Sequence, residues 1–221
     1  MTVLRILSGG AAHGLVEGLR ASFEATTGCR IEGTFGAVGA MKARLLAGEP
    51  ADLMILSRAL TDELVRDGHL VAASVTDVAT VATAVAVRSG DPEPDIADKA
   101  GLVAVLLAAD AIHFPDPAQA TAGIHFAKVI RELGIWDQVA GRLHTAPNGA
   151  TAMRELSAST ARRPIGCTQE TEIRGTPGLA LVAPLPPGCD LVTVYTAAVT
   201  TTARAAAEAG QFISASARPH I

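Results

Sequence analysis

The sequence is poor in aromatic residues, in cysteine and in long apolar runs. Aromatic residues make up 3% of the 221 positions, so a surface of stacked rings for nucleic-acid bases is not expected. The cysteines, Cys29, Cys167 and Cys189, are odd in number and widely spaced, which predicts buried thiols rather than a disulfide framework or a zinc site. No apolar stretch reaches the roughly 20 residues that cross a bilayer, so no membrane insertion is expected.

The chain also lacks an excess of basic charge. It has 18 Lys and Arg against 22 Asp and Glu, a formal net charge of −4. A general nucleic-acid binder needs a basic surface to replace phosphate counterions, so this class is not expected. A small anion remains compatible, because a local site can be positive on an acidic protein. The first ten residues lack the sections of a secretory leader. As written, the sequence predicts a cytoplasmic protein, or a periplasmic one whose leader was trimmed or misannotated.

Short apolar strands alternate with helices along the chain. Residues 3–7, 30–35 and 52–56 have the pattern of buried strands, and each is followed by a segment with one apolar helical face. Gly28 is expected to end the first helix. Such alternation predicts parallel βαβ units. Further strands are expected at 80–88, 111–114, 163–167, 179–182 and 191–199, with a last helix from about residue 202.

Two proline-rich interruptions divide this pattern, one after Arg88 and one at 184–187. They predict an α/β fold of two lobes, each a mostly parallel sheet flanked by helices. The first lobe would comprise residues 1–84 plus 190–221, and the second residues 85–189. A single doubly wound sheet is the alternative. In either fold, ligands favour the carboxyl ends of the strands.

Three turns of small residues fall where a strand gives way to a helix. A helix start offers unpaired backbone N–H groups and the positive end of the helix dipole, and small side chains let an oxyanion approach them. Together the turns could bind a carboxylate or a tetrahedral oxyanion, although glycine-rich turns are common in any α/β protein. No phosphate-loop or dinucleotide signature is present, so no nucleotide cofactor is expected. The candidate residues are Ser8, Gly9, Gly10, Ala37, Val38, Thr121, Ala122 and Gly123.

Few side chains add to these turns. His13 lies near the Ser8 turn and is a weak candidate for an acid or base, with a solvated helix face as the alternative. No pair of histidines has the spacing of a zinc helix, so no metal is expected. Gln169, at the end of a strand, can present both a donor and an acceptor to a ligand, or be a surface glutamine. Lys42 and Arg44 follow the second turn and could attract an anion; the alternatives are a solvated charge for Lys42 and an ion pair for Arg44.

The order of these turns resembles the type II periplasmic binding proteins of the molybdate-binding class. The similarity spans nearly the whole chain. Its most specific element is Gly48–Leu53, the run Gly-Glu-Pro-Ala-Asp-Leu that leads into the third strand. The other matching segments are Ser8–Gly10, Phe35–Gly39, Asp116-Pro117 with Thr121–Gly123, and Ile165–Gln169.

The resemblance implies an anion held in a cleft between the lobes by main-chain N–H groups and hydroxyls. It makes Ser8 the first hydroxyl donor, and it makes Ala122 and the region of Asn148 main-chain donors. Ala37 and Val38 stand where the molybdate binders have a second serine. Gln169 replaces a tyrosine of that family. Both departures open the ring of donors that a compact tetrahedral oxyanion needs.

Two functions from different classes follow from this resemblance. The first is a solute-binding protein of ABC-transporter type, with a permease as partner if the chain is exported. The second is an isomerase of an unsaturated tricarboxylate, because a subgroup with Ser-Gly-Gly at the first turn includes aconitate isomerase. No residue is assigned as its proton carrier, and His13 is the best-placed candidate in the sequence. A sensor domain that needs a partner protein is a third interpretation.

Overall fold

The computed structural model describes residues 2–217, which divide into two compact units. Unit 1 comprises Met1–Thr80 and Thr193–Ile221, and unit 2 comprises Val81–Val192. The chain passes between the units within β4 (Thr76–Arg88) and again within β9 (Val192–Val199). The boundaries expected from sequence were 84/85 and 189/190, and the division into two functional lobes stays a prediction.

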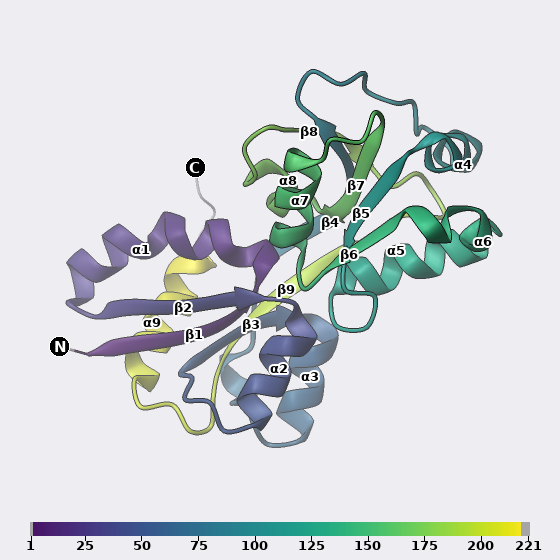
Figure 1. The fold of residues 1–221 in the computed structure, drawn as a ribbon. Coiled ribbons are helices and arrows are strands. Elements are labelled where there is room, and N and C mark those ends of the chain that lie inside the picture. Colours follow the sequence, from purple (N-terminus) through teal and green to yellow (C-terminus); the bar gives the residue numbers. More distant parts are fainter. Residues whose placement is uncertain (1, 218–221) are drawn as a thin grey trace. The chain divides into compact units, whose positions relative to one another are not determined.

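Unit 1 is built on three parallel strands and one antiparallel strand. β2 and β3 both pair in parallel with β1, and β9 pairs antiparallel with β3. The aromatic rings of Phe23 and Phe212 pack edge to face between α1 and α9, which cover one face of the strands while α2 and α3 cover the other (Figure 1). The elements are β1 (Val3–Gly9), η1 (Gly10–Ala12), α1 (His13–Thr27), β2 (Arg30–Gly36), α2 (Val38–Leu46), β3 (Leu53–Ser57), α3 (Arg58–Arg66), η2 (Ala72–Ser74) and α9 (Ala206–Ser216).

Unit 2 repeats this layered plan. β6 and β7 pair in parallel with β5, while β7 and β8 pair antiparallel with β4. One buried cluster lies between the strands and α4, α5 and α6, and a smaller one lies beneath α7 and α8. The elements are α4 (Lys99–Ala108), β5 (Ala111–Pro115), α5 (Thr121–Glu132), α6 (Trp136–Val139), η3 (Ala140–Arg142), β6 (Leu143–Ala146), α7 (Gly149–Ala158), β7 (Pro164–Gln169), α8 (Glu170–Arg174) and β8 (Leu179–Pro184).

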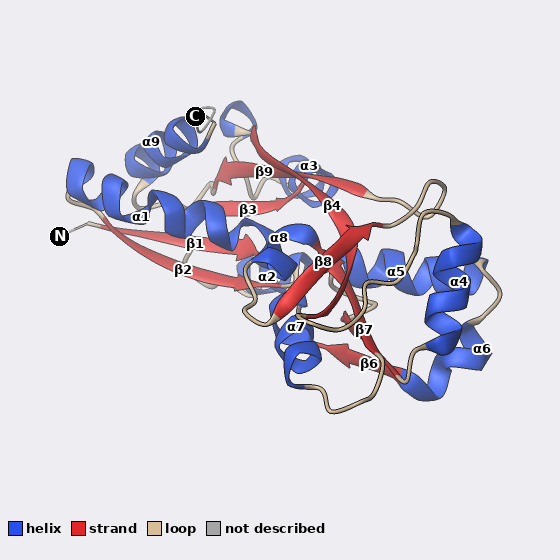
Figure 2. Cartoon of the chain, turned by 90° about the horizontal axis from the view of Figure 1, so that it is seen from above, coloured by secondary structure: helices blue, strands red, loops and turns tan. Residues whose placement is uncertain are grey.

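Most of the expected elements are confirmed, with small shifts at their ends. Gly28 ends α1 in the left-handed conformation, with φ of 67°, as glycine does at a helix end. β1 and β2 run side by side (Figure 2). The last helix begins at Ala206 rather than near residue 202, because the preceding loop is bound to Asp52 through the N–H groups of Arg204 and Ala205. The three cysteines are free and buried, as expected.

The elements of unit 2 that were not expected include β6 and α7. β6 has only four residues, and two of them, His144 and Thr145, are exposed, so it lacks the apolar run that marks a buried strand. α7 begins after Asn148, whose side chain accepts a hydrogen bond from the N–H of Thr151 at 2.9 Å. Asparagine at that position is a helix-start signal, and it was present in the sequence.

Candidate functional site

In unit 1, three parallel strands end at the same edge. Gly9 of β1 is paired with Gly36 of β2, and Ser8 with Ile55 of β3. Because the strands are parallel and in this register, η1, α2 and α3 all begin at that edge. The Ser8–Gly10 and Gly36–Gly39 turns, expected to act together, are therefore neighbours within this unit.

Gly9 is the position in this edge where a side chain does not fit. A Cβ atom there would lie 2.8 Å from Cγ1 of Val38 and 3.0 Å from the ring of Tyr195. The Ser8 hydroxyl is fully buried and donates to the carbonyl oxygen of Gly9 at 2.9 Å. Ser8 therefore fixes the backbone of the turn in this state, whereas the family resemblance implied that its hydroxyl donates directly to a ligand.

The helices that begin at this edge have no side-chain cap. Neither Ala37 before α2 nor Ser57 before α3 makes a capping hydrogen bond through its side chain. The first N–H groups of an uncapped helix remain available to a bound group. Ser57 was not among the sequence candidates. It is 9% exposed and is paired in register with Tyr195. The sequence pattern that could have identified it is a serine at the end of a buried strand, as with Ser8.

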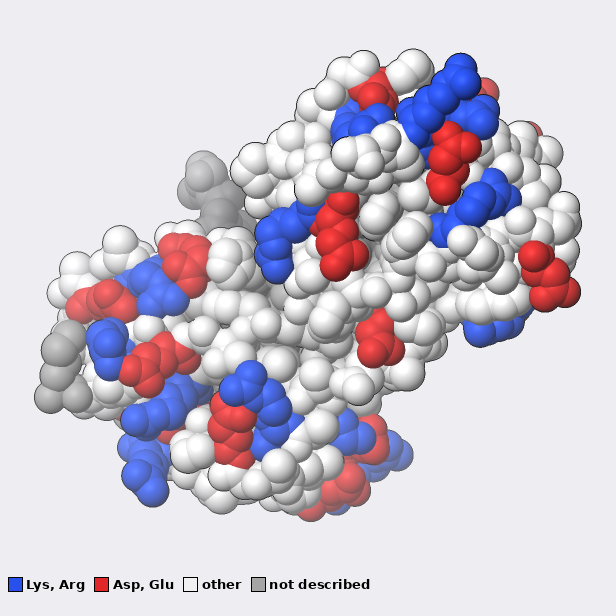
Figure 3. Space-filling view, in the orientation of Figure 1, with Lys and Arg blue, Asp and Glu red and all other residues white. Residues whose placement is uncertain are grey.

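Charged side chains near these turns are mostly paired. Arg44 pairs with Glu49 at 2.5 Å, which confirms the ion pair expected for it. Lys42 pairs with Glu63 at 2.5 Å rather than being a solvated charge. On the face drawn in Figure 3, basic and acidic side chains of the described residues alternate. An anion at this edge would therefore be held mainly by backbone N–H groups. His13 is exposed and packs edge-on against Phe35, with ring centroids 4.6 Å apart.

In unit 2, the strand ends are arranged in the same way. β5, β6 and β7 are parallel, with Pro115 of β5 paired with Ala146 of β6. α5, α7 and α8 consequently begin at one edge. Ala120 before α5 makes no side-chain cap, so the first turn of α5, Thr121–Gly123, keeps its backbone N–H groups free of a capping side chain.

Close backbone packing explains the glycine in this turn. A Cβ atom on Gly123 would collide with the carbonyl oxygens of Pro115 and Asp116. Asp116 also orders the loop, because its carboxylate accepts from the N–H groups of Ala118 and Gln119 at 2.7 and 3.2 Å. Gly123 and Asp116 therefore allow the start of α5 to pack directly against the end of β5.

Asn148 and Gln169 lie at the same edge in different roles. The Asn148 side chain caps α7, which uses its oxygen within the protein. Gln169 ends β7, is 2% exposed and stands at the N-cap position of α8. The neighbouring carboxylate of Glu172 accepts from the Thr168 hydroxyl at 2.6 Å.

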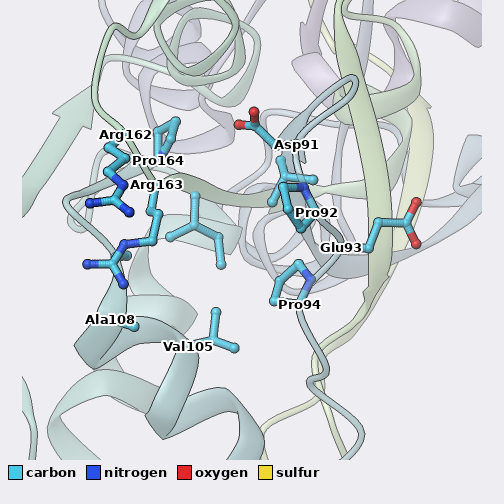
Figure 4. A pocket seen from close by; sticks show the side chains of 12 residues that line it. Asp91, Pro92, Glu93, Pro94, Val105, Ala108, Arg162, Arg163 and Pro164 are labelled. Atoms are coloured by element: carbon cyan, nitrogen blue, oxygen red, sulfur yellow. The ribbon is translucent and has the colours of Figure 1, made fainter.

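A separate pocket of about 240 Å³ lies at the opposite end of the unit 2 strands. Arg162, Arg163 and Pro164, at the start of β7, form one side, and Pro92 and Pro94 form the other (Figure 4). Its remaining walls are mostly valine, isoleucine and alanine side chains. None of the candidate residues lines this pocket. Its mostly apolar walls also do not provide the converging hydrogen-bond donors that a small oxyanion needs.

Among residues 2–217, no group of three or more His, Cys, Asp or Glu side chains is placed to hold a metal ion. Within that range, no helix is long and apolar enough to cross a membrane.

The fold is that of the type II periplasmic binding proteins. The periplasmic molybdate-binding protein of Azotobacter vinelandii matches with a TM-score of 0.78 and 20% identity, over 98% of this chain and 93% of that one. The sulfate-binding protein of Mycobacterium tuberculosis matches with a TM-score of 0.79 and 17% identity, over 99% and 83%.

The sequence places the chain within this class. It belongs to the bacterial extracellular solute-binding protein family, whose model matches residues 4–215. It is also 26% identical to an aconitate isomerase of Pseudomonas, over 90% of this chain and 76% of that protein.

Proposed function

We propose that the chain binds a small anion, an oxyanion or an organic carboxylate, through backbone N–H groups at helix starts. The observation that carries this proposal is the set of helix starts without side-chain caps at the strand ends of each unit, α2 and α3 in unit 1 and α5 in unit 2. Uncapped N–H groups and the helix dipole favour negative charge. Membership of a solute-binding family supports the same function.

In this proposal the ligand contacts are mainly main-chain groups. Gly9, Gly10, Ala37 and Val38 form the unit 1 part, with Ser8 holding the turn in place. Thr121, Ala122 and Gly123, with the side chain of Gln169, form the unit 2 part. The partner would be the permease of an ABC transporter. The chain would act outside the cytoplasm, as the family's name implies.

Isothermal titration calorimetry and thermal shift against molybdate, tungstate, sulfate, citrate and aconitate test the proposal. At least one of these anions is expected to release or absorb heat and to raise the melting temperature. No response from any of them would contradict anion binding.

Proline substitutions test the helix starts themselves. Val38 and Thr121 are the first residues of α2 and α5, and the residues before them are extended. Proline is tolerated at that position and removes one N–H group. Val38→Pro and Thr121→Pro should each weaken binding of the responding anion roughly tenfold or more, the loss of one hydrogen bond to a charged group.

The matched control is Lys99→Pro at the first position of α4, which Asp98 caps by accepting from Gly101 at 2.8 Å. It should leave the affinity nearly unchanged. Unchanged affinity in both test variants, with their melting temperatures retained, would show that α2 and α5 do not bind the anion.

The similarity to an aconitate isomerase favours a second candidate function, the movement of a double bond in an unsaturated tricarboxylate. A proton would be removed next to a carboxylate and returned at another carbon, with His13 as the candidate acid or base. Proton NMR of cis- and trans-aconitate in deuterated water tests it. Without interconversion or deuterium uptake, this function is excluded for that substrate.

A further inference from the structure

A partly buried glutamate of unit 2 lies where two helices begin. Glu172 is the third residue of α8, and its side chain accepts from the backbone N–H groups of Gln169 and Ala150. The Thr168 hydroxyl donates to the same carboxylate at 2.6 Å. Three donors from β7, α7 and the start of α8 therefore converge on one acidic side chain.

This arrangement caps two helices with one residue. At α8, a glutamate at the third position that accepts from the N-cap N–H group is half of a capping box. At α7, Ala150 is the second residue, and its N–H group is one of those that an external anion would meet. Asn148 takes the N–H group of Thr151, so two of the first three N–H groups of α7 already have acceptors.

The chain leaves room for this carboxylate at one specific position. A Cβ atom on Gly149, the first residue of α7, would collide with the carboxylate of Glu172 and with the hydroxyl of Thr168. Glycine therefore permits the close approach of Glu172 to the helix start. This is how a backbone typically accommodates an anionic ligand, but the anion here belongs to the protein.

The contacts of Glu172 suit an ionised carboxylate. The pKa of Glu172 is raised from its ordinary value, because burial raises it by more than the hydrogen bonds from Thr168, Gln169 and Ala150 lower it. Two of the three contacting groups are backbone N–H groups, which only donate, and an ionised carboxylate can accept from all three. A protonated Glu172 would have less capacity to accept from them.

We propose that Glu172 is an internal anion that fills the start of α7 and excludes a ligand's anionic group from it. Glu172 would then determine the specificity of the site. This inference rests on the anion-binding function proposed above. A bound anion meets unit 2 at the start of α5, whereas Asn148 and Gly149 do not contact it. The part of the ligand that faces α7 is expected to carry no negative charge.

Chemical rescue by formate tests whether α7 accepts an anion when Glu172 is removed. Glu172→Ala deletes the carboxylate and leaves its donors in place. Formate should raise the melting temperature of this variant in a saturable manner, by roughly 3–6 °C at ten times its dissociation constant. If the variant is unfolded without formate, the same titration should restore its helical circular dichroism.

Glu155→Ala, which removes an exposed acid from α7, is the matched control for ionic strength and net charge. A response of Glu172→Ala no larger than that of Glu155→Ala would overturn the proposal. The wild type separates this result from the proposed function. If no ligand site exists, the wild type shows no saturable response to formate, yet the rescue of Glu172→Ala is unaffected.

Discussion

Acidification should destabilise unit 2 through His113, and this prediction follows from one buried ring. His113 lies on β5, is 7% exposed, and neither of its ring nitrogens has a hydrogen-bond partner within residues 2–217. It stacks on the exposed His144 of β6, with ring centroids 4.9 Å apart. Burial, and secondarily the charge of His144, lower the pKa of His113 from 6.5 to about 4.

The direction follows from the proton balance. In the unfolded chain the ring binds a proton near pH 6.5, and in the folded protein only near pH 4, so the unfolded state binds more protons between these values. The stability contribution is complete above pH 6.5 and is lost as the pH falls toward 4. Between pH 7 and pH 5 the free energy of unfolding should drop by about 2 kcal/mol from this group.

Urea unfolding at pH 7, 6 and 5 measures this loss, with the fluorescence of Trp136 as a reporter within unit 2. His113→Leu removes the titrating group and fills its apolar surroundings. The wild type should lose about 2 kcal/mol more than this variant over the range. Comparing the two removes the contributions of other titrating groups, Glu172 among them.

His144→Gln serves as the matched control. It removes the exposed partner and the smaller of the two causes, so it should keep most of the wild-type pH dependence. If wild type and His113→Leu lose equal free energy between pH 7 and pH 5, the reasoning from burial is refuted.

Two further substitutions test buried contacts by the free energy of unfolding. Gly149→Ala should lower the free energy of unfolding by about 2–4 kcal/mol, because the new Cβ atom collides with Glu172. Gly141→Ala, with no neighbouring atom within 4 Å of the added Cβ, should change this free energy by less than about 1 kcal/mol. Equal effects of the two substitutions would contradict the packing argument. Asp52→Ala should cost about 2–4 kcal/mol because it leaves three backbone N–H groups without their acceptor. Asp62→Ala, at a side chain 57% exposed, should change it by less than about 0.5 kcal/mol, and a comparable loss would show that the Asp52 bonds contribute little.

Local pattern was enough to predict most of the fold. Buried strands such as 53–57 are runs of apolar residues, and Gly28 marks a helix end by a conformation that favours glycine. The three small-residue turns were found because they follow such strands. β6 escaped because an edge strand with two exposed side chains carries no such run.

The candidate site was less accessible to sequence reasoning, because its contacts connect distant residues. Asp52 belongs to the most specific motif of the resemblance, and its carboxylate accepts from Arg5, Arg204 and Ala205, the latter two 152 and 153 positions away. Through Asp52 the motif thus connects β1 to the loop before α9 within unit 1. Glu172 accepts from Gln169 within its own helix start, but its contact with Ala150 joins α8 to α7, and no local pattern marks that contact.

The discontinuous composition of unit 1 has a consequence for biosynthesis. Unit 2 is a single stretch of sequence, whereas unit 1 needs Thr193 and the residues after it to supply β9 and α9. Until that stretch leaves the ribosome, the nascent β3 has no β9 beside it and Asp52 has only the N–H group of Arg5. The strands β1 to β3 are thus translated before unit 2 but completed only after it, and until then the open edge of β3 is a point at which the emerging polypeptide needs protection from aggregation.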